Sequence, residues 1–246
     1  MQITILKIGG GADINLPGIA ADLKQFEGQV VVVHGANAVR DDLARRLGTP
    51  TRTITSASRV SSVFTDEKAL DVLTMAYGGL VNKRFVSLCQ QNGVNAIGLT
   101  GLDGGLVRGR RNPGIRVEEN GRKRLVHDLS GKPVEVNSAL IQLLLANGYT
   151  PVITVPILDE NGYAVSTEND SVVALLQSRL MAKRVIQLME APGLLRDPED
   201  TCILEVLAKL RGGAALGSRL RRCQQGTVAV LGRLGYTRHI NPFVFA

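Results

Sequence analysis

The stretch ITILKIGGG, residues 3–11, decides the fold of this chain. It is an apolar run that leads through Lys7 into three glycines, Gly9 to Gly11. A short buried strand that ends in this way is suited to an anion, because glycines let backbone N–H groups approach closely and the lysine adds a mobile positive charge. Glycine turns also follow many strands that bind nothing, so a plain turn is the alternative until the rest of the chain is considered.

A second apolar run, QVVVVH at residues 29–34, lies between two stretches of helical periodicity, 16–26 and 39–47. An unbroken run of β-branched residues is typical of a strand that is covered on both faces of a parallel sheet. The alternation of strands and helices predicts an α/β fold, a three-layer α/β/α sandwich around a mainly parallel sheet. Further elements continue this pattern: short strands at 95–99, 151–157 and 185–189, a long helix from Asp66 to Leu88 with Thr65 as its N-cap, and a helix at 203–210.

The size and composition are those of a globular protein. With 246 residues, of which 44% are hydrophobic and 21% charged, the chain is long enough for a well-buried core and lies near the upper limit for a single one. One large domain and two closely joined lobes both fit this length. We expect a lobe boundary near Tyr149, which separates residues 1–148 from residues 149–246.

The net charge of +7 calls for an anionic partner, and charge alone leaves nucleotide, nucleic acid and acidic protein open. Aromatic residues make up only 4% of the chain and Trp is absent. This composition argues against a platform that stacks the bases of single-stranded nucleic acid. Basic residues gather in two places, at 108–124 and at 211–222.

The cysteines and histidines suggest neither a disulfide framework nor a metal site. The three cysteines are far apart and form no paired motif, and the three histidines lack metal-ligand spacing. Free thiols suit a reducing cytoplasm. The sequence shows no secretion leader and no apolar run near the roughly 18 residues of a spanning helix. We therefore expect a cytoplasmic protein with no membrane partner.

Two common nucleotide motifs are missing from the sequence. It contains no Gly-x-x-x-x-Gly-Lys-Ser/Thr phosphate loop and no Gly-x-Gly-x-x-Gly between a strand and a helix. Glycine turns instead follow successive expected strands, at 9–11, 35, 101–105 and 193. Because the carboxyl ends of parallel strands meet at one edge of a sheet, these turns are expected to line one crevice.

Six short phrases of the sequence occur together in one known family. They are KIGG at 7–10, VHG at 33–35, Thr65-Asp66, GLVNK at 79–83, NAIGLTGLDG at 95–104, and Asp170 at the mouth of a helix. This set resembles the amino acid kinase family and, within it, the acetylglutamate kinase branch. The phrases at 79–84 and 95–104 look most like kinases that act on glutamate or 2-aminoadipate carried on a small acidic amino-group carrier protein. The likeness covers nearly all of residues 1–195.

The resemblance implies the amino acid kinase fold and transfer of the γ-phosphoryl group of ATP to a side-chain carboxylate, which gives an acyl phosphate in the biosynthesis of lysine or arginine. By the same resemblance, residues 1–148 hold the acceptor and residues 149–246 hold the nucleotide. Mg²⁺ is expected to arrive on the ATP phosphates, without metal ligands from the protein. Relatives are usually dimers, so a homodimer through the helix Asp66–Leu88 is also expected.

The family's catalytic roles fall on matching positions of this sequence. Lys7 would bridge the transferring phosphoryl group. Asp170 would organise Lys7 and a second basic group, Arg222 or Arg221, through charge-assisted bonds, unless it only caps its helix. Further contacts are expected from turns and loops: backbone N–H groups of Gly9, Gly10 and Gly35 to phosphoryl and carboxylate oxygens, and Glu190, Gly193 and Leu195 at the nucleotide.

Several acceptor-binding positions depart from the family's pattern. Ala36 replaces a second glycine after the histidine, and its methyl is expected to crowd the acceptor. Val63 stands where an arginine usually grips the α-carboxylate, and Arg59 is the nearest replacement in the sequence. Ser166 replaces the usual asparagine of the acceptor site. The nucleotide lobe is expected to be shortened, since the sequence stops at Ala246 where relatives continue into a further strand.

Three functions remain open on this evidence. The leading one is a kinase for a carboxylate linked to an acidic carrier protein. The others are N-acetylglutamate kinase acting on the free small molecule and a non-catalytic relative that binds nucleotide or carrier. An acidic carrier would be drawn to a basic face, and the candidates for that face are Arg108, Arg110, Arg111, Arg122, Lys123 and Arg124.

Overall fold

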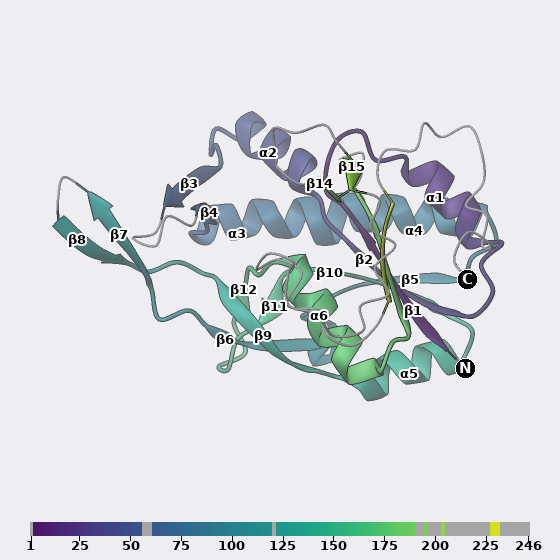
Figure 1. Ribbon diagram of the computed structural model, residues 1–246. Coiled ribbons are helices and arrows are strands. Elements are labelled where there is room, and N and C mark those ends of the chain that lie inside the picture. Colours follow the sequence, from purple (N-terminus) through teal and green to yellow (C-terminus); the bar gives the residue numbers. More distant parts are fainter. Residues whose placement is uncertain are drawn as a thin grey trace.

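A computed structural model of the chain describes residues 2–55, 61–119, 122–189, 194–195, 203–204 and 227–231. The elements that it contains form a central sheet with helices on both sides (Figure 1). The helices are α1 (Leu16–Leu23), α2 (Asn37–Arg46), α3 (Glu67–Thr74), the π-helix η1 (Met75–Val81), α4 (Asn82–Gln91), the short 3₁₀ turn η2 (Asp103–Gly105), α5 (Ser138–Ala146) and α6 (Asn169–Leu180).

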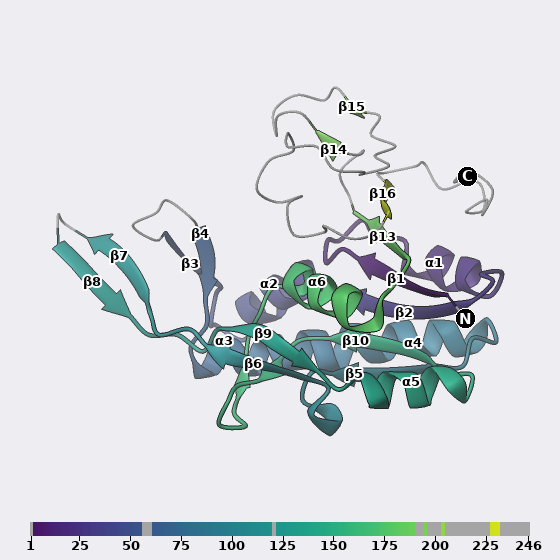
Figure 2. The same ribbon diagram turned by 60° about the horizontal axis from the view of Figure 1, so that its bottom comes forward.

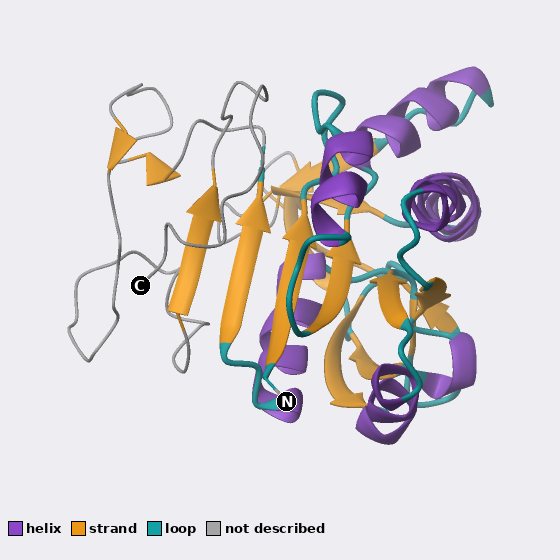
Figure 3. Cartoon of the chain, turned by 90° about the vertical axis from the view of Figure 1, so that its right-hand side faces the viewer, coloured by secondary structure: helices purple, strands orange, loops and turns teal. Residues whose placement is uncertain are grey.

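The central sheet has six strands in the order β16-β13-β1-β2-β10-β5, and every pairing within it is parallel. Figure 3 shows these strands side by side with their arrowheads pointing the same way. The expected α/β fold with a mainly parallel sheet is therefore confirmed. The strands are β1 (Ile3–Ile8), β2 (Gln29–His34), β5 (Ala96–Thr100), β10 (Thr150–Thr154), β13 (Arg184–Leu188) and β16 (Thr227–Leu231).

Alternate residues of β1 and β2 enter two separate cores, because successive side chains of a strand point to opposite faces. Leu6, Ile8 and Val32 pack with α1 and α4, while Ile5 and Val31 pack with α5 and α6. Figure 1 shows the two pairs of helices on opposite sides of the sheet. This division decides which helix each functional side chain of β1 and β2 can reach.

A smaller four-stranded sheet and three hairpins complete the described part of the chain. The hairpins β3–β4 and β7–β8 extend from the same end of the molecule (Figure 2). In the β3–β4 pair, Arg52 lies opposite Phe64 and Thr55 opposite Ser61. The strands are β12 (Ala164–Val165), β11 (Ile157–Leu158), β6 (Val107–Arg111) and β9 (Gly131–Val136) in the sheet, and β3 (Arg52–Thr55), β4 (Ser61–Phe64), β7 (Ile115–Glu119), β8 (Arg122–Val126), β14 (Leu194–Leu195) and β15 (Ile203–Leu204) in the hairpins.

The long helix expected from Asp66 to Leu88 exists, but it is not regular. The π-helix η1 separates α3 from α4 and contains the pair Gly78-Gly79. The N-cap is Asp66 and not Thr65, because the Asp66 carboxylate accepts a hydrogen bond of 2.9 Å from the N–H of Ala69. Thr65 is buried and bonds elsewhere.

Other boundaries differ from those expected. The apolar run 151–157 breaks after Thr154, where a cis peptide joins Val155 to Pro156, and β11 begins only at Ile157. Strand β9, which no apolar pattern indicates, ends at Val136. Residues 203–204 form strand β15 where a helix was expected, because tertiary pairing with β14 overrides the short apolar pattern. In the part of the chain that is described, none of the helices has the length and apolarity to cross a bilayer.

Candidate active site

A lysine and a carboxylate meet at the carboxyl edge of the central sheet. Lys7 points to the same face of β1 as Ile5, which is the face that α6 covers. Its Nζ lies 3.0 Å from Oδ1 of Asp170, and the Lys7 side chain is only 15% exposed whereas that of Asp170 is 63% exposed. The expected pair is therefore formed.

Asp170 does not cap its helix. It is the second residue of α6, and Glu168 occupies the N-cap position without a side-chain cap bond. The helix-capping interpretation of Asp170 is therefore wrong, and its carboxylate is directed at Lys7 instead. The exposed side of the pair faces solvent, so an incoming anion can reach the ammonium group while the carboxylate holds it in place.

Two of the three glycine amides expected to bind oxygens are already engaged. The N–H of Gly9 donates to the Leu188 carbonyl at 2.8 Å, and the N–H of Gly35 donates to the Ile8 carbonyl at 2.9 Å. These bonds extend the parallel sheet by one residue on either side of β1. The expected N–H contacts from Gly9 and Gly35 are therefore wrong for this structure.

Gly10 and Gly35 allow the chain segments that follow β1 and β2 to approach each other closely. A Cβ on Gly10 would lie 2.6 Å from the backbone nitrogens of both Ala36 and Asn37, and a Cβ on Gly35 would lie 2.9 Å from the nitrogen of Gly10. No side chain larger than hydrogen fits without moving the backbone. The Gly10 carbonyl then accepts a hydrogen bond of 2.8 Å from the N–H of Ala38.

Gly10 lies against the first turn of α2. In the described residues, the amides of Gly10 and Asn37 have no backbone hydrogen-bond acceptor. The start of a helix also carries the positive end of its dipole. We call the pair of amides, Gly10 and Asn37, the amide cradle; together with Lys7 on the adjoining strand it suits a phosphoryl group.

Ala36 does not crowd this cradle with its methyl group. Its side chain is fully buried in the core that also contains Val33, Leu73 and Ala76. The expectation that this methyl would obstruct the acceptor is wrong, because the turn directs Cβ of residue 36 toward the helix α3 and η1 side. Ala36, which stands where the family usually has glycine, thus adds its methyl group to the core.

The buried His34 ring is hydrogen-bonded to Gly35, the first residue after β2. Alternation along β2 places its ring on the face of Val32, toward α4. Its Nδ1 lies 3.1 Å from the Gly35 carbonyl, and Asn82 Nδ2 lies 3.1 Å from its Nε2. Burial, opposed by the hydrogen bond to Gly35 and assisted by the nearby Lys83 charge, lowers the pKa of His34 to about 4. The neutral ring therefore donates from Nδ1 to Gly35 and accepts at Nε2 from Asn82.

Asn82 and Lys83 tie this histidine to the neighbouring strands. Asn82 also donates to the Val152 carbonyl at 3.0 Å, and Lys83 donates to the Gly98 carbonyl at 2.9 Å. The loop at 98–104 is closed by Asp103, whose Oδ2 accepts from both the N–H and the hydroxyl of Thr100. The start of helix α4 is therefore hydrogen-bonded to strands β2, β10 and β5.

The buried neutral His34 makes stability depend on pH. Its pKa is about 4 when folded and 6.5 otherwise, so the unfolded chain binds more protons between these values. We expect the free energy of unfolding to fall by up to about 3 kcal/mol as pH drops from roughly 6.5 to 4. Urea titrations at several pH values check this, and in His34→Gln the fall in this window should be smaller. An equal fall in both proteins would contradict the assignment to His34.

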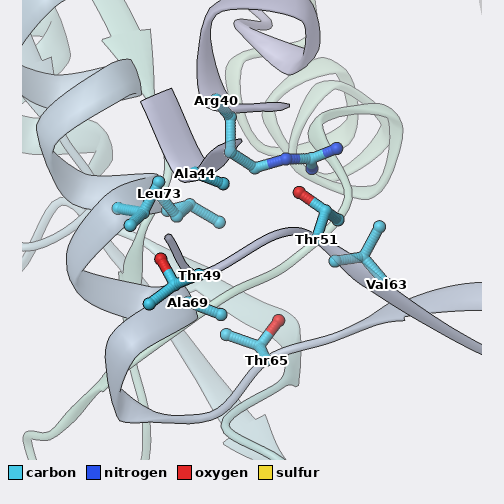
Figure 4. Close-up of a pocket in the computed structure, with 9 residues that line it drawn as sticks. Arg40, Ala44, Thr49, Thr51, Val63, Thr65, Ala69 and Leu73 are labelled. Carbon is cyan, nitrogen blue, oxygen red and sulfur yellow. The ribbon is translucent and has the colours of Figure 1, made fainter. Parts of the chain in front are cut away.

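Val63, an expected acceptor-binding position, lies where α2, the β3–β4 hairpin and α3 meet. A cavity of about 20 Å³ is lined there by Arg40, Thr51, Val63 and Thr65, among others (Figure 4). This volume suits a single water molecule. The hydroxyl of Thr49 borders it, buried and without a hydrogen-bond partner in the described residues.

Arg40 lies beside Val63, and sequence reasoning missed it. Its guanidinium pairs with Oδ1 of Asp41 at 2.9 Å, and the same oxygen accepts a hydrogen bond of 2.7 Å from the Thr51 hydroxyl. Only the folding of the hairpin over α2 brings Arg40 and Val63 together, so no local pattern could have shown it. Ser166 is placed nearby, with its hydroxyl 3.1 Å from that of Thr65.

The remaining expected site residues are only partly described. Arg108, Arg110 and Arg111 lie exposed on β6, and Arg124 lies exposed on β8. For Arg122 and Lys123 on β8, and for Leu195 on β14, only the backbone is described. The predictions that fall outside the described residues are those for Arg59, Glu190, Gly193, Arg221 and Arg222.

These features define an α/β protein in which a lysine–carboxylate pair and an amide cradle lie at the carboxyl ends of adjacent parallel strands, an arrangement suited to an anion. Comparison with known proteins identifies the class further. The chain belongs to the amino acid kinase family, which matches residues 2–207. The family resemblance expected from the sequence is thereby confirmed, and with it the assignment of the chain to a family of phosphotransferases.

Individual relatives agree with this assignment. A LysW-aminoadipate kinase of Thermus thermophilus is 41% identical over 81% of this chain and 76% of its own length. An acetylglutamate kinase of Phocaeicola vulgatus is 32% identical over 81% of this chain and 75% of its own. Among solved structures, carbamate kinase from Giardia lamblia bound to AMP-PNP has a TM-score of 0.53 at 13% identity, over 78% of this chain and 72% of that one. The last likeness shows the fold alone.

Proposed function

We propose that this protein transfers the γ-phosphoryl group of ATP to the side-chain carboxylate of glutamate or 2-aminoadipate held on a small acidic amino-group carrier protein. The product is an acyl phosphate used in amino-acid biosynthesis in the cytoplasm. The observation that carries the proposal is the Lys7–Asp170 pair at 3.0 Å beside the amide cradle. The Thermus relative, named for LysW-linked aminoadipate, supports the choice of acceptor.

The reaction has to bring two anions into line, so its main demand is neutralisation of charge. The Lys7 ammonium, held by Asp170, faces the phosphoryl group as it passes between nucleotide and acceptor. The N–H groups of Gly10 and Asn37 donate to its oxygens, and they need no reorganisation because the sheet fixes both turns. The carboxylate attacks the γ-phosphorus, the bond from phosphorus to the bridging oxygen breaks, and ADP leaves; no proton transfer is required.

Mg²⁺ would neutralise phosphate charge and would come with ATP. Within the described ranges, no three His, Cys, Asp or Glu side chains gather in a way that could hold a metal ion. We propose that the cation is carried by the nucleotide phosphates. We also propose the order of binding along the sheet: nucleotide toward β13 and β16, phosphoryl group at β1, and acceptor at β2.

An ADP-release assay tests the proposal. The purified chain would be given ATP and Mg²⁺ with the carrier loaded with glutamate or 2-aminoadipate, with the bare carrier, and with free N-acetylglutamate. The proposal expects turnover with a loaded carrier only. Turnover with N-acetylglutamate alone would favour acetylglutamate kinase activity, against which Val63 speaks because it cannot pair with a carboxylate. ATP binding without turnover of any acceptor would favour a non-catalytic partner subunit.

The basic residues of β6 are the proposed docking surface for the carrier. We expect the triple change of Arg108, Arg110 and Arg111 to Ala to raise the KM for the carrier about tenfold at low ionic strength and less at 0.5 M salt, because exposed charges mainly steer association and are screened. The measurement is carrier KM as a function of salt.

The matched control for the docking surface removes positive charge elsewhere. Lys24 and Lys183 are exposed residues that precede β2 and β13, at the amino edge of the sheet. Changing both to Ala should leave the carrier KM near that of the wild type. Equal effects of the two sets, or no effect of the β6 set, would count against docking at β6.

We also propose a homodimer through the helix that spans α3, η1 and α4. Met75 is an exposed large apolar side chain on this helix. Sedimentation of the purified chain gives the oligomeric state directly.

A further inference from the structure

A hydroxyl group from η1 reaches the first turn of α2. Tyr77 is only 4% exposed, and its Oη donates a hydrogen bond to Oδ1 of Asn37. Burial raises the pKa of the Tyr77 hydroxyl, and this effect exceeds the opposing effects of the Arg40 charge and of a backbone hydrogen bond from Ala36; the nearby Asp41 adds a smaller rise. Tyr77 therefore keeps its proton at neutral pH and remains the donor of this bond.

The bond fixes which way the Asn37 amide points. A carbonyl oxygen only accepts, whereas the amide NH₂ group only donates. With Oδ1 held by Tyr77, the two N–H bonds of Nδ2 are directed to the other side of the side chain, away from the hydroxyl. Nδ2 has no hydrogen-bond partner in the described part of the chain, and Asn37 is exposed. The side chain thus presents a preset donor to solvent.

The position of Asn37 indicates which ligand group its Nδ2 donor would bind. Its own backbone nitrogen belongs to the amide cradle, next to Gly10. It follows β2, which lies on the opposite side of β1 from β13. In the binding order proposed above, a group bound beside Asn37 lies on the acceptor side of Lys7, where an acidic acceptor brings carboxylate oxygens that need hydrogen bonds.

We propose that Asn37 is an acceptor-binding residue whose Nδ2 donates to a carboxylate oxygen of the acidic acceptor, and that Tyr77 is its positioning residue. The proposal rests on the proposed function, since it names a contact of that same site. It also explains how an acceptor can be bound where Val63 supplies no positive charge. A buried tyrosine whose hydroxyl merely needs a partner is the competing explanation.

The change Asn37→Asp separates these two explanations. A carboxylate oxygen at the same place still accepts the hydrogen bond from Tyr77, so a purely structural role is preserved. The donor, however, is replaced by an anion. We expect the KM for the loaded carrier to rise at least about tenfold, in the range of a lost hydrogen bond to a charged group, while the KM for ATP and the unfolding midpoint stay as in the wild type.

The positioning role of Tyr77 is tested by its effect on the acceptor KM relative to kcat. Tyr77→Phe should raise the acceptor KM about three- to tenfold with kcat nearly unchanged, because the amide is still present but no longer oriented. In an Asn37→Ala background the same change should have no further effect on KM, since neighbouring residues of one network are not additive. Asp42→Asn, on the exposed outer side of α2, is the matched control and should leave the acceptor KM unchanged.

A direct binding measurement tests the role of Asn37 without relying on catalysis. Calorimetry with N-acetyl-2-aminoadipate in the presence of ADP and Mg²⁺ measures acceptor affinity alone. If the wild type binds this probe but phosphorylates no acceptor, and Asn37→Asp weakens binding at least tenfold, the proposed function fails and this inference stands. Wild-type acceptor affinity in Asn37→Asp, or an effect on ATP alone, overturns the inference; so does a wild type that binds no probe.

Discussion

Replacing Lys7 by Ala is expected to lower turnover by about 10² to 10³, the usual loss when one preorganised charge is removed from a developing anion. Lys7 is well buried for a lysine, and its Nζ is held 3.0 Å from Asp170. The ammonium is thus positioned before substrates arrive. Stopped-flow or coupled measurement of ADP release at saturating ATP and acceptor gives kcat directly.

Two further changes make this result specific to Lys7. Lys7→Arg keeps the charge but replaces a compact ammonium with a planar fork, so it should recover only part of the activity. Lys24→Ala removes an exposed lysine at the amino edge of the sheet and should leave kcat unchanged. Wild-type kcat in Lys7→Ala, with the protein folded by circular dichroism, would remove Lys7 from the reaction.

The change Gly10→Ala is expected to abolish most of the activity and to destabilise the fold by about 1–3 kcal/mol. The added methyl would stand 2.6 Å from two backbone nitrogens and 3.0 Å from the carbonyl carbon of Gly35. Both neighbours are backbone of the turn after β2, so the turn itself must move to relieve the overlap. Such a shift withdraws the amides of the cradle from the bound anion.

A second glycine provides the matched control. A Cβ on Gly79 would meet nothing closer than 4.0 Å, and this residue is helical. Gly79→Ala should therefore keep the free energy of unfolding or raise it slightly, because alanine favours helix. Turnover and urea unfolding are measured on both variants. Gly10→Ala with wild-type turnover would show that the cradle does not hold the phosphoryl group.

Much of the fold follows from local pattern. The runs at Ile3–Ile8 and Gln29–His34 are strands with the expected parallel pairing, residue Ile3 opposite Gln29. Strand β9 was missed because Pro133 and exposed polar residues interrupt any apolar alternation. Strand β16 was missed because it pairs with β13, far away in the sequence, and its assignment depends on that pairing.

The site was predictable where it depends on one strand and one motif. The pairing of Lys7 with Asp170 came from the resemblance to the amino acid kinase family, and the structure places the two side chains 3.0 Å apart. The roles of Ala36, Arg40 and Tyr77 could not be read in the same way. Each depends on which direction a helix turns its side chains after packing, and that direction is set by the whole core rather than by neighbours in the sequence.

The π-helix η1 sets the rotational phase between the two halves of the long helix. In a regular α-helix, residues five apart diverge by about 140°. A π-helix joins residues five apart by hydrogen bonds, as the N–H of Asn82 does with the Tyr77 carbonyl, and so reduces this divergence. Tyr77 and Asn82 are five apart, and their side chains contact the two ends of the β2–α2 connection, at Asn37 and at His34. Removing one residue from this segment would turn one of the two away, so its length matters as much as its composition.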